Sequence, residues 1–124
     1  KVMLSPGSGL IINMSSQMGH VGAPNRTLYC TTKHAVEGLT KALGVELAPN
    51  GIRVNAVAPT FIDTPMTRPM FENPEFKKTV VNNIALGHVG TIEDVAAAVL
   101  FLASPAAAMI TGESLKVDGG WTAW

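Results

Sequence analysis

The chain has 124 residues, and its nine basic and nine acidic side chains give it a formal charge of zero at neutral pH. Apolar residues make up 47% of the sequence and charged residues 15%, a balance that suits a folded domain with a buried core and excludes a highly charged disordered segment. The zero charge gives no electrostatic basis for binding nucleic acid or an anionic membrane, and no apolar run reaches the roughly 20 residues of a membrane span.

The first part of the chain predicts a strand, a long helix and a second strand. An apolar run over residues 10–14 follows a Ser-Pro-Gly-Ser-Gly turn and ends in small polar residues, as buried strands often do. A helix is predicted over residues 28–48, and Pro49-Asn50-Gly51 ends it. Its apolar face is expected to contain Val36, Leu39, Leu43 and Leu47. The second strand, over residues 53–58, is again almost continuously apolar, which is typical of parallel strands covered on both faces.

The second part predicts an irregular insertion, another helix and a third strand. Residues 65–90 form the insertion, within which Asn73-Pro74 predicts a helix start. A helix follows Thr91, which forms a near capping box with Asp94, and Pro105 ends it. The third strand covers residues 114–117. Right-handed crossovers would make a three-stranded parallel sheet, an α/β fold, and would leave the edge along residues 10–14 unpaired.

Three side chains in this pattern can move a proton. Tyr29 and Lys33 stand four residues apart near the start of the predicted helix, and Ser16 precedes the tyrosine by thirteen positions. Positions i and i+4 share a helix face, so the Lys33 ammonium can favour the ionised phenol and make Tyr29 a usable acid or base. The Ser16 hydroxyl could donate a hydrogen bond to a substrate carbonyl. The same Tyr/Lys spacing also arises by chance in many helices, so its context decides its meaning.

Four segments supply that context. They are residues 9–16 (Gly-Leu-Ile-Ile-Asn-Met-Ser-Ser), 29–33 (Tyr-Cys-Thr-Thr-Lys), 52–59 (Ile-Arg-Val-Asn-Ala-Val-Ala-Pro) and 117–120 (Val-Asp-Gly-Gly). With them the chain resembles the short-chain dehydrogenase/reductase family over nearly its whole length. The resemblance implies part of a Rossmann-like, doubly wound parallel sheet. It also implies an NAD- or NADP-dependent enzyme that interconverts a secondary alcohol and a ketone.

The resemblance also assigns the three side chains their roles. Ser16 orients and polarises the substrate oxygen, and Tyr29 is the general acid/base. Lys33 assists the ionisation of the tyrosine and holds the cofactor ribose, so both residues also contact the cofactor. Ser16 is preferred to Ser15 because thirteen residues to the tyrosine is the usual family separation, and Ser15 is kept as a weaker candidate.

The loop after the second strand is implied to close over the nicotinamide. Pro59, the Ile62 backbone and the Thr64 hydroxyl are the candidate cofactor contacts. The family usually has glycine where this chain has Thr60, and threonine resists backbone conformations that glycine adopts.

Candidate substrate contacts lie on two segments. The insertion over residues 65–90 is expected to cover the substrate, which makes Met66, Met70 and Phe71 candidates, with an ordinary apolar packing surface as an equal alternative. Gln17 and His20 follow the catalytic serine closely and could line the pocket or lie on a surface loop. The histidines have no metal-ligand spacing with cysteine or acidic residues, so no metal site is predicted.

The glycine-rich turn that binds the dinucleotide phosphates does not occur in this sequence. Gly7-Ser8-Gly9 precedes a strand, whereas the phosphate-binding turn leads from a strand into a helix. In the family that turn, the residue that selects NAD or NADP and a fourth catalytic residue, an asparagine, all lie upstream. Residues 1–124 are therefore expected to be the carboxyl-terminal half of one dehydrogenase domain. The alternative is a catalytically silent fragment or oligomerisation module.

Within the family, the chain looks most like the branch of sugar-acid dehydrogenases and 3-oxoacyl-carrier-protein reductases. Members of that branch are usually homotetramers, so a homo-oligomer, tetramer or dimer, is expected, with a small alcohol or ketone as the other partner. The single cysteine, Cys30, excludes an internal disulfide and fits a reducing compartment, so a cytoplasmic location is expected.

Overall fold

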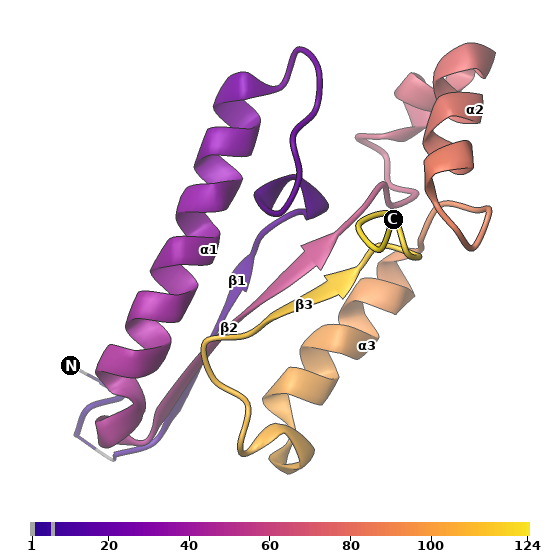
Figure 1. Cartoon of the computed structure of the whole chain (residues 1–124). Helices are drawn as coiled ribbons and strands as arrows, with labels where there is room; N and C mark the ends of the chain where they lie inside the picture. Colours follow the sequence, from indigo (N-terminus) through magenta and orange to yellow (C-terminus); the bar gives the residue numbers. More distant parts are fainter. Residues whose placement is uncertain (1, 6) are drawn as a thin grey trace.

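In the computed structural model, which describes residues 2–5 and 7–124, three strands and three α-helices follow one another along the chain (Figure 1). The strands are β1 (Gly9–Met14), β2 (Ile52–Pro59) and β3 (Ser114–Val117), and the helices are α1 (Thr27–Leu47), α2 (Pro74–Asn83) and α3 (Ile92–Ala103). The predicted elements are confirmed in type and order, and their ends shift by one or two residues at most.

The strands form one parallel sheet in the order β1-β2-β3. Ile11 lies opposite Val54, and Ala56 lies opposite Ser114. Strand β2 is the core of the described structure, since Val54, Ala56, Val57 and Ala58 are all 0% exposed. Within the described residues β1 pairs on one side only, so the predicted unpaired edge is found along this strand.

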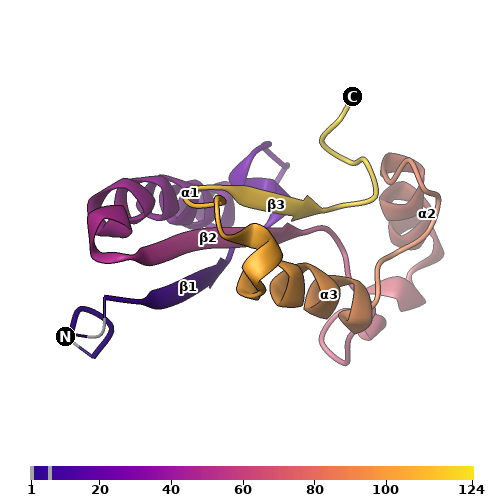
Figure 2. The same cartoon turned by 90° about the horizontal axis from the view of Figure 1, so that it is seen from below.

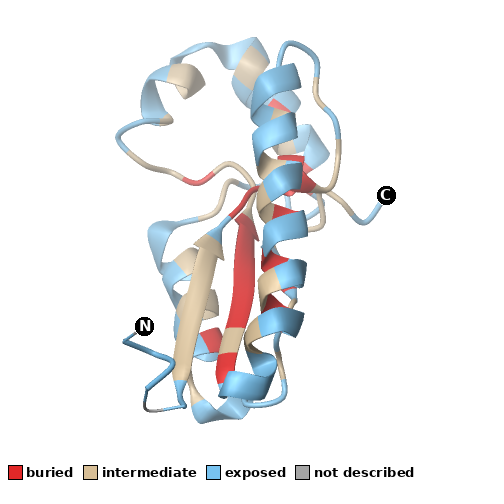
Figure 3. Ribbon diagram, turned by 90° about the vertical axis from the view of Figure 1, so that its left-hand side faces the viewer, coloured by how far each residue is buried: buried red, intermediate tan, exposed pale blue. Residues whose placement is uncertain are grey.

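The two long helices cover opposite faces of the sheet. Figures 1 and 3 show α1 on one face and α3 on the other, and Figure 2 shows the same two layers from below. Because the strands step in one direction from β1 to β3, helices on opposite faces give the two crossovers opposite hands. The expectation that both are right-handed is therefore wrong for one of them. The long segment between β2 and α3 passes the carboxyl ends of the strands first, and this is how the chain reaches the second face.

The face of α1 that packs on the sheet differs from the predicted apolar face. Its buried residues are Glu37, Thr40 and Gly44, whereas Leu39 is 52% exposed. The prediction that Leu39 belongs to the buried face is therefore wrong. Small residues bring the helix close: a Cβ on Gly44 would lie 2.6 Å from the backbone nitrogen of Gly112. Figure 3 shows the exposed outer surface of α1 beside the buried central strand.

The helix ends follow the local sequence signals. Gly51, with φ of 69°, follows the short 3₁₀ turn that extends α1. The Asn73 side chain accepts hydrogen bonds from the first turn of α2, and Thr91 and Asp94 form the predicted capping box at α3. Hydrogen bonds from the Thr91 backbone and hydroxyl hold the pKa of Asp94 below its usual value. Among the described residues, no helix combines the length and hydropathy that crossing a membrane requires.

The Val-Asp-Gly-Gly segment begins with the last residue of β3 and continues into a tight turn. Gly119 and Gly120 have φ of 57° and 86°, and a Cβ on Gly119 would lie 2.5 Å from the side chain of Ile84. Burial works to raise the pKa of Asp118, but hydrogen bonds from the hydroxyl and backbone of Thr122 and from the backbone of Gly120 outweigh it and lower the pKa. Glycine is needed here because side chains resist this backbone conformation.

Candidate active site

The candidate site lies at the carboxyl ends of β1 and β2. The Ser15 N–H donates to the Val57 carbonyl at 2.8 Å, so pairing between the strands continues one residue past β1. The chain then enters a 3₁₀ turn over Gln17–Gly19, which Ser16 caps by accepting a hydrogen bond from the Met18 N–H at 3.2 Å. This places Ser16 just beyond the carboxyl end of a strand, as the sequence predicts. The expectation that the strand is buried is wrong for the described structure, because β1 pairs on one side only and its residues are partly exposed. Its hydroxyl hydrogen remains available to a substrate oxygen.

Tyr29 and Lys33 lie together on α1 beside that turn. The helix begins at Thr27, so Tyr29 is in its first turn, with 44% of its surface exposed. Lys33 Nζ donates to the Met14 carbonyl at 2.9 Å and lies 5.6 Å from the centre of the Tyr29 ring. The hydrogen bond to the end of β1 thus holds the ammonium next to the phenol.

Ser16 and Tyr29 line the same pocket, whose volume is about 680 Å³. That volume falls within the range of small-molecule sites. The wall is formed by the turn after β1, the start of α1, the loop after β2 and the insertion: Ser16, Gln17, Met18, Asn25, Arg26, Thr27, Leu28, Tyr29, Thr60, Phe61, Thr67 and Met70.

Two buried polar atoms of the wall have no hydrogen-bond partner among the described residues. They are Gln17 Oε1 and Thr60 Oγ1, and Gln17 is only 1% exposed. Buried polar groups are nearly always hydrogen-bonded, and leaving one unpaired costs roughly 1–3 kcal/mol. Both residues line the pocket, so their oxygens are candidate hydrogen-bonding groups for a polar ligand there. The buried Ser15 hydroxyl also has no partner among the described residues, but it does not line the pocket.

The loop after β2 accommodates threonine in place of the family's glycine. Among described residues other than glycine, Asn25 alone has a positive φ, 58°, so the Thr60 backbone does not need the left-handed conformation. The Thr60 N–H donates to the Val117 carbonyl at 3.1 Å and continues the pairing of β2 with β3. The Thr67 hydroxyl donates to the Ile62 carbonyl at 2.5 Å, and its oxygen lies 3.1 Å from the hydroxyl oxygen of Thr64. These contacts hold Ile62 and Thr64 just beyond the end of β2.

An aromatic cluster attaches the insertion to the rest of the site. The Phe61 ring lies 6.3 Å from Phe71, 5.7 Å from Phe76 and 5.7 Å from Trp121 between ring centres. These four rings come from the loop after β2, the insertion, α2 and the turn after β3. The pairs of Phe61 with Phe71 and Phe76 are edge-to-face, a geometry that favours a defined packing over a loose apolar surface. Phe71 and Phe76 therefore attach the insertion to Phe61 in the pocket wall.

The structure brings only some of the expected substrate contacts to the pocket. Gln17 and Met70 line it, whereas Met66 is 85% exposed and lies outside the wall. The ring of Phe71 belongs to the aromatic cluster. His20 is also absent from the wall, and its Nε2 instead lies 3.2 Å from Ser114 Oγ and 3.3 Å from Glu37 Oε1.

Several residues at or next to the site were not predicted from the sequence. Asn25, Arg26 and Thr27 form the pocket wall just before Tyr29, and Glu37 lies under the turn that carries Ser16. A signal for Glu37 was available, since it follows Lys33 by the same four residues that separate Lys33 from Tyr29. Within residues 2–5 and 7–124 no three His, Cys, Asp or Glu side chains gather closely enough to hold a metal ion.

Comparison with known proteins identifies the family. Residues 1–122 match the family model described as Enoyl-(Acyl carrier protein) reductase. Together with the Rossmann-like sheet and the Ser/Tyr/Lys arrangement, this match places the chain in the short-chain dehydrogenase/reductase family, as the resemblance implied.

Individual relatives agree with this placement. L-xylulose reductase of Bos taurus is 44% identical over 93% of this chain and 47% of its own length. Galactitol 2-dehydrogenase (L-tagatose-forming) of Cereibacter sphaeroides is 44% identical over 100% of this chain and 50% of its own. The crystal structure of a gluconate 5-dehydrogenase from Burkholderia cenocepacia in complex with NADP and tartrate superposes with a TM-score of 0.95 at 32% identity, covering 99% of this chain and 48% of that one. The chain thus spans about half the length of the relatives it matches.

Proposed function

We propose that this chain is the carboxyl-terminal half of an NAD- or NADP-dependent oxidoreductase that interconverts a secondary alcohol and a ketone, with Tyr29 as the general acid/base. The arrangement of Lys33 carries the proposal. Its ammonium is tied to the end of β1 and lies 5.6 Å from the centre of the Tyr29 ring, and Tyr29 shares a pocket with Ser16. A phenol exchanges protons poorly at neutral pH unless a fixed positive charge stands beside it.

Each of the three side chains has a defined role in the proton transfer. In the reducing direction the Tyr29 hydroxyl gives its proton to the carbonyl oxygen of the substrate, and in the oxidising direction the phenolate takes the proton back. Ser16 Oγ accepts from the Met18 N–H and can donate its own hydrogen to the same substrate oxygen. The Lys33 ammonium, 5.6 Å from the centre of the Tyr29 ring, stabilises the negative charge that develops on the phenolic oxygen.

The cofactor would lie against Tyr29, Lys33 and the loop after β2, and it supplies the hydride. Pro59, Ile62 and Thr64 are the residues of that loop proposed to contact it. The buried, unpartnered hydroxyl of Thr60 supports a polar ligand at this position. Lys33 uses one of its three N–H groups on the Met14 carbonyl, so two others can reach a ribose hydroxyl.

The pocket wall offers both polar and apolar contacts to a small substrate. Gln17, Asn25, Arg26 and Thr27 carry amide, guanidinium and hydroxyl groups, whereas the remaining large side chains of the wall are mainly apolar: Met18, Leu28, Phe61 and Met70. We propose a short alcohol or ketone that carries further hydroxyl or carboxyl groups, which is the chemistry named for the xylulose, galactitol and gluconate enzymes. Gln17 is the proposed contact to such a hydroxyl.

Substitution of Tyr29 by phenylalanine tests the proposal in the full-length parent. Tyr29→Phe removes the exchangeable proton and keeps the ring, so turnover should fall at least about 100-fold while NAD(P)H affinity changes little. Thr31→Ala is the matched control. Thr31 is exposed on the same helix, and its hydroxyl donates a hydrogen bond to the Thr27 carbonyl one turn earlier. Retained turnover in Tyr29→Phe would remove the tyrosine from the mechanism.

A catalytically silent fragment or oligomerisation module is the second candidate. Exposed apolar side chains on α1 and α3 favour it: Leu28 is 82%, Val45 79% and Leu100 69% exposed. Titration of NAD(P)H onto the 124-residue chain separates the two proposals. Measurable affinity would contradict a silent module, and affinity confined to the full-length parent would agree with a nucleotide site that needs both halves.

The same exposed apolar residues support a homo-oligomer, either tetramer or dimer, that pairs through α1 and through α3 with β3. We propose a cytoplasmic location from the single cysteine, Cys30, which is a free thiol. Equilibrium sedimentation of the parent measures its oligomeric state, and a monomer at micromolar concentration would exclude the proposed pairing.

A further inference from the structure

Glu37 is a charged residue at a buried position that the proposed reaction does not use. It is 6% exposed and lies on the sheet-facing side of α1, four residues after Lys33 and eight after Tyr29. These positions place all three on one face of the helix. Burying a carboxylate costs free energy unless hydrogen bonds compensate, so the hydrogen bonds of Glu37 indicate what the residue does.

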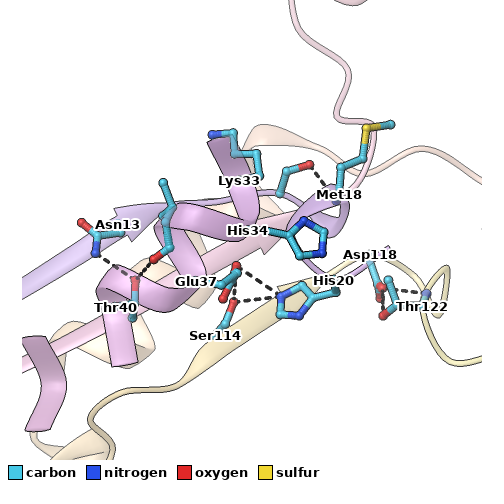
Figure 4. A network of polar contacts seen from close by, with 12 residues as sticks. Asn13, Met18, His20, Lys33, His34, Glu37, Thr40, Ser114, Asp118 and Thr122 are labelled. Carbon is cyan, nitrogen blue, oxygen red and sulfur yellow. Dashed lines mark hydrogen bonds and ion pairs between the residues drawn. The ribbon is translucent and has the colours of Figure 1, made fainter. Parts of the chain in front are cut away.

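Those contacts join three separate elements (Figure 4). Glu37 Oε1, on α1, accepts a hydrogen bond from Ser114 Oγ, on β3, at 3.0 Å and lies 3.3 Å from His20 Nε2. His20 follows directly after the 3₁₀ turn that Ser16 caps, and its Nε2 is 3.2 Å from Ser114 Oγ. The helix that carries Tyr29 is therefore tied to the turn that carries Ser16 and to the end strand of the sheet.

The direction of each hydrogen bond follows from the donors present. A carboxylate can only accept, so the single hydroxyl hydrogen of Ser114 goes to Glu37. The Ser114 oxygen must then accept from His20, which requires that His20 Nε2 carries a hydrogen. The network thus selects one ring nitrogen as the donor and one orientation of the imidazole.

Glu37 also supports the turn directly. A Cβ on Gly19 would lie 2.9 Å from Glu37 Cγ and 3.0 Å from Glu37 Oε1, so the carboxylate side chain packs against the backbone of the turn. The same Cβ would lie 2.9 Å from Ser15 Oγ. Because Ser16 caps this turn, any shift of the turn moves the Ser16 hydroxyl relative to Tyr29.

We propose that Glu37 is a positioning residue: with His20 and Ser114 it fixes the turn that carries the Ser16 hydroxyl against the helix face that carries Tyr29 and Lys33. The inference rests on the proposed function, because it assigns Glu37 an effect that passes through Ser16. Glu37 touches neither the pocket nor the tyrosine. Its substitution should therefore lower kcat more than it changes the KM for the cofactor.

A double-mutant cycle in the full-length parent tests this coupling. Glu37→Ala should lower kcat about 10- to 100-fold, the range expected when a reacting group is misplaced by about 1 Å. In a Ser16→Ala background the same substitution should lower kcat less than about 2-fold, because the group it positions is already gone. Equal effects in both backgrounds would overturn the proposal, since a merely structural loss is additive.

Conservative variants complete the test. Glu37→Gln keeps one oxygen that can accept from Ser114 and His20. Its amide nitrogen takes the place of Glu37 Oε2, which has no partner among the described residues, so no existing hydrogen bond is lost. The kcat of this variant should therefore be within about 5-fold of wild type. Glu46→Ala, which removes an exposed carboxylate from the same helix, should leave kcat unchanged. If Glu37→Gln is as slow as Glu37→Ala, the hydrogen-bond account is wrong.

The outcomes separate this inference from the proposed function. If Ser16→Ala alone leaves kcat unchanged, the proposed role of the serine fails. If Ser16→Ala lowers kcat but Glu37→Ala has the same effect with and without Ser16, only the positioning role fails. Should Glu37→Ala not fold, Ser114→Ala takes its place in the cycle, because it removes the hydroxyl that donates to Glu37.

Discussion

Asn55 should be among the most sensitive positions for stability. It lies on β2 with 0% exposure, its Nδ2 donates to the Ile110 carbonyl at 2.8 Å, and its Oδ1 accepts from the Glu113 N–H at 3.0 Å. Both partners belong to the segment that leads into β3. Asn55→Ala would remove both hydrogen bonds, although the Ile110 carbonyl would still accept from Arg53 Nη1 at 3.3 Å. Each hydrogen bond contributes about 0.5–1.5 kcal/mol, so the expected loss in the free energy of unfolding is about 1–3 kcal/mol.

Urea unfolding of the full-length parent measures this loss. Asn82→Ala is the control, because it removes an exposed asparagine from α2 and should change the free energy of unfolding by less than about 0.5 kcal/mol. A loss below about 1 kcal/mol for Asn55→Ala would refute the reasoning. It would mean that these two hydrogen bonds do not attach the chain before β3 to the central strand.

Three further outcomes are expected in the parent. Lys33→Met removes the ammonium beside Tyr29, so steady-state kcat should fall about 5- to 150-fold, and an unchanged kcat would exclude the electrostatic role. Gly119→Ala introduces a side chain at a backbone φ of 57° and should lower the Tm of thermal unfolding by several degrees. Gly22→Ala is the control and should leave Tm unchanged, because no atom lies within 4 Å of the new Cβ. The folded-state pKa of Asp118 is lowered, so its contribution to stability is present above about pH 4 and is lost as the pH falls through that pKa. Asp118→Asn should make the urea midpoint fall less between about pH 4 and pH 2, and identical profiles would contradict this.

Local signals in the sequence predicted the parts of the fold that depend on neighbouring residues. Asn73 and Thr91 cap their helices as expected, because a cap needs only the next three residues. The failure at Leu39 has the opposite cause. Which side of α1 faces the sheet depends on how closely the helix approaches it, and the small Gly44 and the hydrogen-bonded Thr40 decide that approach. The crossover of reversed hand likewise depends on the path of the long segment before α3.

The site shows the same division. Tyr29 and Lys33 could be recognised because four residues on a helix bring side chains together. The contacts of Glu37 could not, since His20 and Ser114 are 94 residues apart in the sequence and meet only through the sheet. The unpartnered oxygens of Gln17 and Thr60 could not be predicted from the sequence either, because the burial of a polar atom depends on how the residues of the wall pack together.

Transfer of deuterium from a nicotinamide cofactor tests the central claim most directly. The full-length parent is incubated with a short hydroxylated ketone and with NADH or NADPH that is deuterated at the transferred position. The mass of the alcohol product is then measured by mass spectrometry. The account predicts an alcohol with one deuterium at the former carbonyl carbon, formed by the wild type and not by Tyr29→Phe. Product without deuterium, or equal transfer by Tyr29→Phe, would contradict it.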